Sequence, residues 1–594
     1  MNHILFMQVQ TPTPTPTIFS PLSKGPGYGH KIFPRPNMST ATATPETLSS
    51  PTVDSRRTAN YKPNIWNSEF LESLKRDQMD VQDKYEKIDK ETLSFEVKNM
   101  MADEDLELMV VFQLIDSIQR LGLGIDFDSD IKRSLRRIAC NFGDLKLHLH
   151  ATALGFRLLR QNGNMVSQDV FKQFMSEEGK FKLSLCNDID GMISLYEASY
   201  VAYEEEHLLE EAKAFTSKHL AHLCLNEHKL IANQVNRTLD LPLRYRMPRL
   251  EARHYIEASS TKNDSNTKVV ALCELAKLDF NMTQLIYQED LQDMTRWWKE
   301  LGLSNKLSFA RDRLMECFFW GTGTTPRAEL SYCRKALTKV CKFITIIDDI
   351  YDVYGHMHEL ELFTNAVERW DVNVVDDLPY YMKLTFLALY NTVNEIGYEV
   401  LKQKGYNCVP FLKKAWEDVL KSFLVEAKWC HYKQTPTFEE YINNGWVSAS
   451  GVVALTHAFF FVSQDITPEA LDCFKNNHDI LRLPSMVFRL SNDLATYEDE
   501  IERGETANAI SCYAKKAGVS LEDSREHISK MIDESWKRLN EIQVDNKTPF
   551  SDDFIETALN LARTSQCAYQ QGDGHGSPEL IKKHILSIFV DPIK

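Results

Sequence analysis

Three aspartates lie close together in a stretch that is otherwise apolar and aromatic, FITIIDDIYDVYG at Phe343–Gly355. On an α-helix Asp348 and Asp352 lie one turn apart on one face, while Asp349 points about 100° away. Burying an unpaired carboxylate is costly, so these groups must be neutralised, paired or bound to a cation. Mg²⁺ takes one or two protein carboxylates and leaves its other positions to water and substrate phosphate. The motif therefore predicts a magnesium site, the alternative being a solvated acidic turn.

A second stretch, RLSNDLATYEDEIERGE at Arg489–Glu505, places three different oxygen donors on one helical face. Asn492, Thr496 and Glu500 follow one another at intervals of four residues, so an amide, a hydroxyl and a carboxylate line up over two turns. Arg489 lies near the same face and can bind a phosphate oxygen. By itself the stretch is equally compatible with a charged surface helix. Together with the aspartate motif it predicts a second metal-binding helix.

A pair of arginines stands just before three aromatic residues in FARDRLMECFFW, Phe309–Trp320. We predict an amphipathic helix over this stretch, with Arg311 and Arg313 on either side of Asp312. An arginine pair beside an aromatic wall can hold a diphosphate above an apolar cavity. An aromatic face also stabilises a cation, by about 0.5–2 kcal/mol. A salt-bridged arginine pair on the surface is the alternative interpretation.

The elements that position these motifs are predicted to be helices. From Arg56 onward the apolar residues recur at spacings of three and four, and no stretch shows the period-two alternation of several strands. A polar break, SSTKNDSNTK at Ser259–Lys268, predicts a linker. A chain of 594 residues is too long for one ordinary core. We therefore predict an all-α fold with an N-terminal helical domain over 56–268 and a C-terminal helical domain over 269–594.

Residues 1–55 differ in composition from the rest of the chain. They contain nine of the 21 prolines and fifteen serines and threonines, but only two acidic residues, Glu46 and Asp54. Such a segment cannot bury enough apolar surface to offset its conformational entropy, so we predict that it is disordered. Richness in Ser and Thr with few acids is typical of an organelle transit peptide, which predicts plastid import.

Charge, hydropathy and cysteine usage exclude several classes of protein. The net charge of −16, with no large Lys/Arg cluster, argues against a nucleic-acid partner. No run approaches the 18 to 20 consecutive apolar residues of a membrane span, so we expect no membrane partner. The twelve cysteines form no CxxC pair, which favours reduced thiols inside the cell. Nothing in the sequence encodes an assembly, and we expect a monomer.

Taken in order, these motifs resemble those of plant class I terpene synthases. The resemblance rests on DDIYD, NDLATYEDE, RDR and the pair Arg56-Arg57 followed after eight residues by Trp66. It is collinear from Arg56 onward and includes LGFRLLRQNG, SLYEAS, RWW and YQQGDGHG. The Arg-Arg-x8-Trp motif behind a plastid-like leader is typical of the angiosperm monoterpene subgroup. The resemblance implies a C-terminal class I helical bundle and an N-terminal relict α-barrel domain.

The resemblance also implies roles for individual residues. Asp348 and Asp352 would bind two of three Mg²⁺ ions, which Mn²⁺ can replace, and Asp349 would support the cluster. The third ion would be held by Asn492, Thr496 and Glu500.

Further roles concern the diphosphate and the cavity. Arg311 and Arg489 would contact the diphosphate with help from Arg313, and Arg56 and Arg57 would fold over the mouth of the site. The residues expected to line or close the pocket are Trp320, Phe488, Tyr569 and Asp573.

The implied reaction is ionisation of an allylic prenyl diphosphate by a lyase. We predict the C10 substrate geranyl diphosphate and an acyclic product of the ocimene, myrcene or linalool type. Isoprene synthases of the same subgroup keep Phe488 and Asn508 but usually carry Phe where this chain has Cys341, which favours C10 over C5 here. A C15 substrate giving a farnesene or nerolidol type product stays open, as does an inactive helical paralogue that only binds. Chain-elongating synthases are disfavoured because the second motif is not aspartate-rich.

Overall fold

The computed structural model describes most of the chain. The described residues are 56–59, 61–74, 90–103, 105–223, 229–260, 267–502, 507–545 and 547–594. The predicted transit peptide, 1–55, lies outside them, and so does 261–266 of the predicted linker. Residues Arg56–Lys594 form one compact unit. Within the described ranges every regular element is a helix, with one isolated β-bridge between Met175 and Phe181. The all-α prediction is confirmed.

The N-terminal helices surround a core of their own. These helices are α3 (Lys90–Ala102), α4 (Leu108–Arg120), α5 (Asp128–Ala139), α6 (Leu149–Gln161), α7 (Ile189–Ser199), α8 (His207–Leu223) and α10 (Pro248–Ser260). The short helix α1 (Ser68–Ser73) instead packs through Leu71 into the core of the C-terminal helices, and α9 (Lys229–Asp240) shares a small cluster with α7 and α8 through Val235. Phe112, Leu135 and Phe156 belong to this core. Gly155 allows the close packing of α6 on α4, since a Cβ there would lie 2.6 Å from the Phe112 ring.

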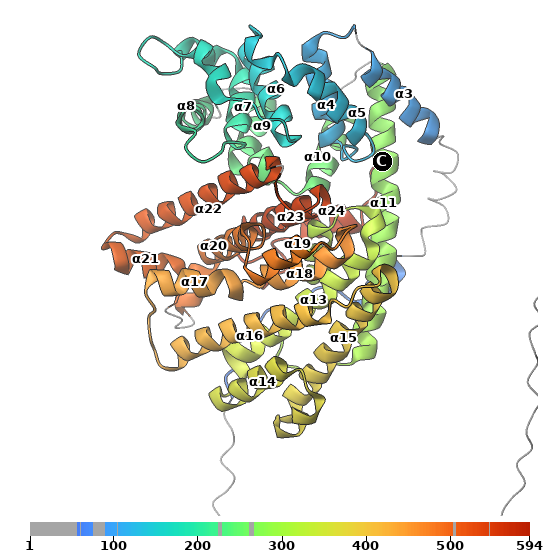
Figure 1. Cartoon of the computed structure of the whole chain (residues 1–594), viewed down its shortest axis with the longest axis vertical. Coiled ribbons are helices and arrows are strands. Elements are labelled where there is room, and N and C mark those ends of the chain that lie inside the picture. Colours follow the sequence, from blue (N-terminus) through green and yellow to red (C-terminus); the bar gives the residue numbers. More distant parts are fainter. Residues whose placement is uncertain are drawn as a thin grey trace, which may run out of the picture. The chain divides into compact units, whose positions relative to one another are not determined.

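The remaining α-helices pack around a second and larger core (Figure 1). They are α11 (Thr267–Leu301), α12 (Leu314–Thr324), α13 (Ser331–Asp349), α14 (Met357–Arg369), α15 (Tyr380–Lys404), α16 (Val409–His431), α17 (Phe438–Ser448), α18 (Gly451–Val462), α19 (Pro468–Lys475), α20 (Asp479–Glu502), α21 (Ala509–Ala517), α22 (Leu521–Val544), α23 (Asp552–Tyr569) and α24 (Lys582–Phe589). Short 3₁₀ helices occupy Phe142–Asp144, Gln168–Phe174, Leu183–Asn187, Leu243–Tyr245, Ala328–Leu330 and Val372–Asp377.

The 35-residue helix α11 contributes to both cores (Figure 1). Leu275 and Phe280, in its first half, pack into the N-terminal core, whereas Leu291 and Trp298 pack into the second core. The predicted boundary between 268 and 269 falls inside α11, close to its start, and it stays a proposal because this helix belongs to both cores.

The helix that carries the aspartate motif ends differently from the prediction. The α-helical part, α13, stops at Asp349, and a π-helical turn continues from Ile350 to Tyr354. A π turn closes its hydrogen bonds one residue later than an α turn, so it is wider. Asp348 therefore lies in the last turn of α13, and Asp352 lies in the π turn that follows it.

The predicted helix over Phe309–Trp320 begins later than expected, at Leu314. Tertiary contacts hold the preceding loop instead. Lys342 is buried and donates from Nζ to the carbonyl of Arg311 at 3.0 Å and to the carboxylate of Asp312 at 3.2 Å. Trp298 donates from Nε1 to the same carboxylate at 3.0 Å. These polar contacts outweigh the helical pattern, since propensity is overridden by tertiary packing.

One segment of the described chain is long and apolar enough to cross a membrane by composition alone. It covers Phe438–Val462, and 67% of its most apolar window is buried inside the protein. The segment is interrupted between α17 and α18 by Ser450, which has a left-handed backbone conformation with φ of 66°. Its apolar character is that of helices in the core of the second helical bundle.

Candidate active site

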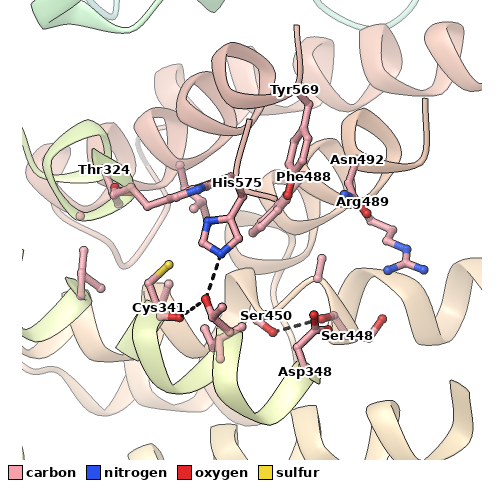
Figure 2. A pocket seen from close by; sticks show the side chains of 18 of the residues that line it. Thr324, Cys341, Asp348, Ser448, Ser450, Phe488, Arg489, Asn492, Tyr569 and His575 are labelled. Carbon is pink, nitrogen blue, oxygen red and sulfur yellow. Dashed lines mark hydrogen bonds between the residues drawn. The ribbon is translucent and has the colours of Figure 1, made fainter. Parts of the chain in front are cut away.

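A cavity of about 160 Å³ lies among the C-terminal helices (Figure 2). Its polar lining includes Arg311, Asp348, Arg489, Asn492 and Asp573. Its apolar lining includes Trp320, Leu337, Cys341, Ile344, Phe423, Phe488, Leu561 and Tyr569. The cavity therefore has an aromatic and aliphatic wall together with charged groups of both signs. An arrangement of this kind suits a ligand with an apolar body and an anionic head.

The three aromatic residues predicted for the cavity wall come together from α12, α20 and α23. The ring centroids of Trp320 and Phe488 are 4.6 Å apart, and Tyr569 lies 6.0 Å from each of them. Burial and the nearby Asp573 raise the pKa of Tyr569 well above its usual value. The phenol therefore stays neutral and presents a π face on which a cation is stabilised.

Arg311 pairs with two of the three motif aspartates. Its backbone N–H donates to Asp349 Oδ2 at 2.6 Å and its Nε donates to Asp349 Oδ1 at 2.8 Å. Its Nη2 donates to Asp348 Oδ2 at 2.5 Å. The Asp349 side chain is 0% exposed, whereas that of Asp348 is 33% exposed. Asp349 thus holds Arg311 in place, and Asp348 is the carboxylate that faces the cavity.

The carboxylate of Asp348 is poorly compensated by protein groups alone. Burial raises its pKa to about 6, even though Arg311 acts in the opposite direction. The negative charge of Asp349 beside it adds to the shift. A divalent cation at this position would stabilise the ionised form. Asp352, by contrast, lies at an exposed position of the π turn and is not among the residues that line the cavity.

On α20 the three predicted oxygen donors share one side of the helix. Asn492 lines the cavity, and Thr496 and Glu500 are buried. The Thr496 hydroxyl donates to Glu500 Oε1 at 2.5 Å. Asn508 Nδ2 donates to Glu500 Oε2 at 2.8 Å. Asn508 therefore positions the carboxylate, a role that the sequence motif does not reveal.

Arg489 supplies positive charge on the same helix. Its Nε and Nη2 donate to the Tyr441 hydroxyl at 2.8 and 2.5 Å. Its Nε also lies 3.1 Å from Oδ1 of Asp493, a fully buried carboxylate. The Tyr441 hydroxyl donates in turn to Asp493 at 2.8 Å. Asp493 thus holds Arg489 on the α20 side of the cavity, as Asp349 holds Arg311 on the α13 side.

These donors fit a magnesium cluster in their chemistry. Among the described residues no group of three His, Cys, Asp or Glu side chains is already gathered around one point. Of the candidate ligands, the carboxylate of Asp348 on α13 and the amide of Asn492 on α20 line the cavity (Figure 2), and the hydroxyl of Thr496 and the carboxylate of Glu500 follow Asn492 along α20. Mg²⁺ prefers such oxygens and keeps several positions for water and phosphate. The two arginines in the cavity lining, Arg311 and Arg489, would attract an anion to the same place.

An extended segment, Arg56–Trp66, crosses the C-terminal helices; we call it the strap, and Asn60 within it lies outside the described residues. Arg56 donates from Nη1 and Nη2 to Glu359 at 2.8 and 2.9 Å. Trp66 donates from Nε1 to Glu316 at 2.8 Å. Arg57 is exposed, with Nη1 3.9 Å from Cys430 Sγ. The strap is therefore anchored by Arg56 and Trp66 and not by Arg57.

Two further predicted residues have structural contacts that the sequence did not indicate. Arg313 is buried and donates to the carbonyls of Lys62, His575 and Gly576 at 2.5 to 3.1 Å. It does not line the cavity and instead ties the strap to the loop after α23. Asp573 lines the cavity, but its Oδ1 accepts the backbone N–H groups of His575 and Gly576 at 3.1 and 2.8 Å. Its carboxylate shapes this loop.

His575 is a cavity residue that the sequence analysis did not single out. Its Nε2 lies 2.9 Å from the Thr345 hydroxyl, which itself donates to the Cys341 carbonyl at 2.9 Å (Figure 2). Burial, with Arg311 and Arg313 nearby, lowers the pKa of His575 well below its usual value. The imidazole is therefore neutral, and its Nε2 is engaged with the Thr345 hydroxyl. The residue belongs to the YQQGDGHG stretch, but no spacing marks it.

The Arg56–Glu359 ion pair predicts a pH-dependent contribution to stability. Burial raises the pKa of Glu359, but hydrogen bonds from Arg56, the His356 backbone and Tyr381 outweigh burial and lower it to about 2. Because this value lies below the unfolded-state value, the stabilisation is complete above about pH 4.5 and is lost as the pH falls towards about 2. We expect Glu359→Gln to lower the free energy of unfolding at neutral pH by about 1–3 kcal/mol in urea titrations.

The difference between Glu359→Gln and the wild type should shrink as the pH falls below about 4.5. Glu361→Gln is the control, because its carboxylate is 53% exposed and is paired with Lys428. We expect that variant to change the free energy by less than about 0.5 kcal/mol. A Glu359→Gln difference of the same size at neutral pH and at about pH 3 would contradict the assignment.

Two family models match the chain. Residues 299–538 match the model described as "Terpene synthase family, metal binding domain", and residues 65–239 match "Terpene synthase, N-terminal domain". Among curated proteins, tricyclene synthase TPS4, chloroplastic, of Medicago truncatula is 49% identical over 552 residues, which cover 91% of this chain and 93% of that protein.

Solved structures of two related enzymes superpose on most of this chain. One is isoprene synthase from leaves of grey poplar (Populus x canescens), in complex with three Mg²⁺ ions and dimethylallyl-S-thiolodiphosphate. It is 48% identical with a TM-score of 0.82, and the match covers 89% of this chain and 99% of that one. The other is limonene synthase with 2-fluorolinalyl diphosphate, which is 37% identical with a TM-score of 0.85 and covers 91% and 100% of the two chains.

Proposed function

The chain belongs to the terpene synthase family, and we propose that it is a magnesium-dependent lyase that converts geranyl diphosphate into a monoterpene and diphosphate. The observation that carries this proposal is the cavity itself. Its wall is built by Trp320, Phe488 and Tyr569, and its lining also contains the carboxylate of Asp348 and the arginines Arg311 and Arg489. A prenyl diphosphate has the same two parts, an apolar chain and an anionic head.

The charged groups act on the leaving diphosphate. Asp348 and Asp352 would hold two of three Mg²⁺ ions, and the third would be held by Asn492, Thr496 and Glu500. When bound, the metal neutralises the diphosphate and stabilises the charge that develops as the carbon–oxygen bond breaks. Arg311 and Arg489 bind oxygens of the same group and are already held in place by Asp349 and Asp493. Such preorganised charges require little rearrangement at the moment of reaction.

The apolar wall acts on the carbocation that ionisation leaves behind. The faces of Trp320 and Tyr569 stabilise positive charge through their quadrupoles. The strap excludes water from the cavity, which prevents premature capture of the cation. The last proton passes to a weak base, for which no strongly basic side chain is required. We propose an acyclic product of the ocimene, myrcene or linalool type, because the sequence motifs resemble synthases of that kind.

The size of the substrate depends on Cys341, which lines the cavity and is only partly buried. Its small side chain leaves room for ten carbons. We expect Cys341→Phe to lower kcat/KM for geranyl diphosphate at least about tenfold, since overfilling a packed site costs about 1–3 kcal/mol. Turnover of dimethylallyl diphosphate, a C5 substrate, should fall less or rise.

Cys341→Ser, which barely changes the side-chain volume, is the matched control for this prediction. It should retain geranyl diphosphate as the preferred substrate. Undiminished turnover of geranyl diphosphate by Cys341→Phe would show that this position does not limit the substrate, and the C10 assignment would lose its structural support.

The proposal as a whole is tested by supplying C5, C10, C15 and C20 allylic diphosphates with Mg²⁺ and identifying the volatile products by gas chromatography and mass spectrometry. The protein used in this assay begins at Arg56, because residues 1–55 are proposed to be removed in the plastid. We expect turnover of the C10 substrate above all. Turnover of none would support an inactive paralogue, and turnover of C15 alone by a protein whose fluorescent fusion stays outside plastids would support a sesquiterpene synthase.

A plastid location is proposed on two grounds. Residues 1–55 have the composition of a transit peptide, and the curated relatives that resemble this chain include several named chloroplastic. We propose that the enzyme acts there as a monomer.

A further inference from the structure

The guanidinium of Arg311 has an aromatic ring over one of its faces. Its Cζ lies 4.7 Å from the ring centroid of Tyr61, a half-buried residue of the strap. The edge of the guanidinium is engaged separately, by Nε with Asp349 and by Nη2 with Asp348. A ring on the face and carboxylates at the edge together fix the plane of the group.

Tyr61 is held over Arg311 by contacts on either side of it in the strap. On one side Arg56 forms its two hydrogen bonds with Glu359. On the other side the carbonyl of Lys62, the next residue, accepts from Arg313 Nη2 at 2.5 Å. The position of the ring is therefore set by the docking of the strap and does not depend on Arg311 alone.

Arg311 has a donor ready for a phosphate oxygen. A guanidinium has five N–H donors, and here Nε and Nη2 are bonded to carboxylates. Within the part of the chain that the structure describes, Nη1 donates to no protein group. The attraction to a ring face uses none of the N–H donors. Tyr61 can therefore stay in place while Nη1, or Nη2 after leaving Asp348, takes up an anion.

From this geometry we infer that Tyr61 is a positioning residue for Arg311, and that its ring couples docking of the strap to binding of the diphosphate. The inference rests on the proposed function, because it assumes that a diphosphate binds at Arg311. It adds a residue whose ring acts on the anion through the arginine and without touching the anion itself. In a diphosphate complex, Nε of Arg311 would keep its hydrogen bond to Asp349. The Tyr61 ring would keep the guanidinium in an orientation in which Nη1 and Nη2 can donate to the anion.

The test measures diphosphate binding without turnover. Inorganic pyrophosphate is titrated in the presence of saturating Mg²⁺, and the rise in the thermal unfolding midpoint is recorded for the wild type, Tyr61→Phe and Tyr61→Leu. Leucine keeps apolar volume but has no ring face. We expect Tyr61→Leu to need about fivefold more pyrophosphate for the half-maximal shift, in line with the loss of one partly buried cation–π contact. Tyr61→Phe should stay within about twofold of the wild type.

A second measurement separates coupling from a general loss of structure. Hydrogen exchange of the strap amides should slow when pyrophosphate is added to the wild type and to Tyr61→Phe, but not when it is added to Tyr61→Leu. The midpoint with Mg²⁺ alone should be the same for all three proteins. If Tyr61→Leu does not fold, Tyr61→Met provides the same comparison. Tyr398→Leu, at a tyrosine on α15 that is 65% exposed, is the matched control and should behave as the wild type.

The outcomes distinguish this inference from the proposed function. If the wild type responds to pyrophosphate and Tyr61→Leu responds at the same concentration, Tyr61 does not position Arg311 and the inference is overturned while the proposed function stands. If the wild type neither responds to pyrophosphate nor turns over any allylic diphosphate, the proposed function fails and the inference fails with it. Equal losses in Tyr61→Leu and Tyr61→Phe would also overturn it, because the ring would then not be the relevant feature.

Discussion

Asp348→Asn is expected to lower kcat by about 100- to 1,000-fold, the range typical for loss of one preorganised electrostatic group, while the circular dichroism of the helices stays unchanged. The asparagine side chain has nearly the same shape as aspartate but no charge. Asp348 is the motif carboxylate that lines the cavity, and burial already raises its pKa to about 6. The substitution removes a carboxylate that is proposed to bind Mg²⁺. It does not disturb Asp349, which keeps its two hydrogen bonds from Arg311.

Metal titration provides the accompanying readout for Asp348→Asn. The rise in the unfolding midpoint on adding Mg²⁺ with pyrophosphate should be much smaller than in the wild type, since only a competent site gains stability from its ligand. Asp376→Asn is the control, because that carboxylate is fully exposed and away from the cavity lining. Near-normal turnover by Asp348→Asn would falsify the assignment of this residue as a metal ligand.

Arg311→Met should lose both activity and stability, because this arginine neutralises a buried carboxylate and is also proposed to bind the diphosphate. Asp349 is 0% exposed and is paired with Arg311 Nε at 2.8 Å. Breaking a buried ion pair by removing one partner typically costs about 3–5 kcal/mol. We expect a loss of that size in the free energy of unfolding by urea, and a fall in kcat of about 100-fold or more from the missing diphosphate contact.

The double variant Arg311→Met/Asp349→Asn separates the two roles. Replacing the carboxylate by an amide removes the unpaired charge, and the backbone N–H of residue 311 can still donate to the remaining carbonyl oxygen. Stability should therefore return to within about 1 kcal/mol of the wild type, whereas turnover should stay low. Full stability in the single variant would show that Asp349 does not depend on Arg311. Recovery of turnover in the double variant would exclude a direct role of Arg311 with the substrate.

The sequence was sufficient to predict candidate site residues that follow one another at helical spacing on a single helix. Asn492, Thr496 and Glu500 share a side of α20 because their spacing matches the helical period, and the all-α fold follows from the same periodicity. The resemblance to a known family predicted that Trp320, Phe488 and Tyr569 line one cavity, although they lie on three helices far apart in sequence.

What the sequence did not predict depends on contacts between distant segments. Arg311 and Arg313 look equivalent in RDR, yet one faces the cavity and the other binds carbonyls of the strap and of the loop after α23. The late start of α12 likewise follows from tertiary contacts, those that Lys342 and Trp298 make with the loop before it. Tyr61 is part of the motif RRTANYKPNIW, but nothing in the motif indicates that its ring lies over the guanidinium of Arg311.

The sharing of α11 between two cores has a consequence for how the protein folds. The side-chain amide of Asn281, in the first half of this helix, donates to the backbone carbonyl of Ile593 and accepts from its backbone N–H, 312 residues further along the chain. Ile593 also packs into the N-terminal core. Contacts across so long a stretch form late, because the entropy of closing the loop is lost before they stabilise anything. The N-terminal core is thus completed by a residue from the C-terminal end of the chain, and we expect the two cores to unfold as one cooperative unit.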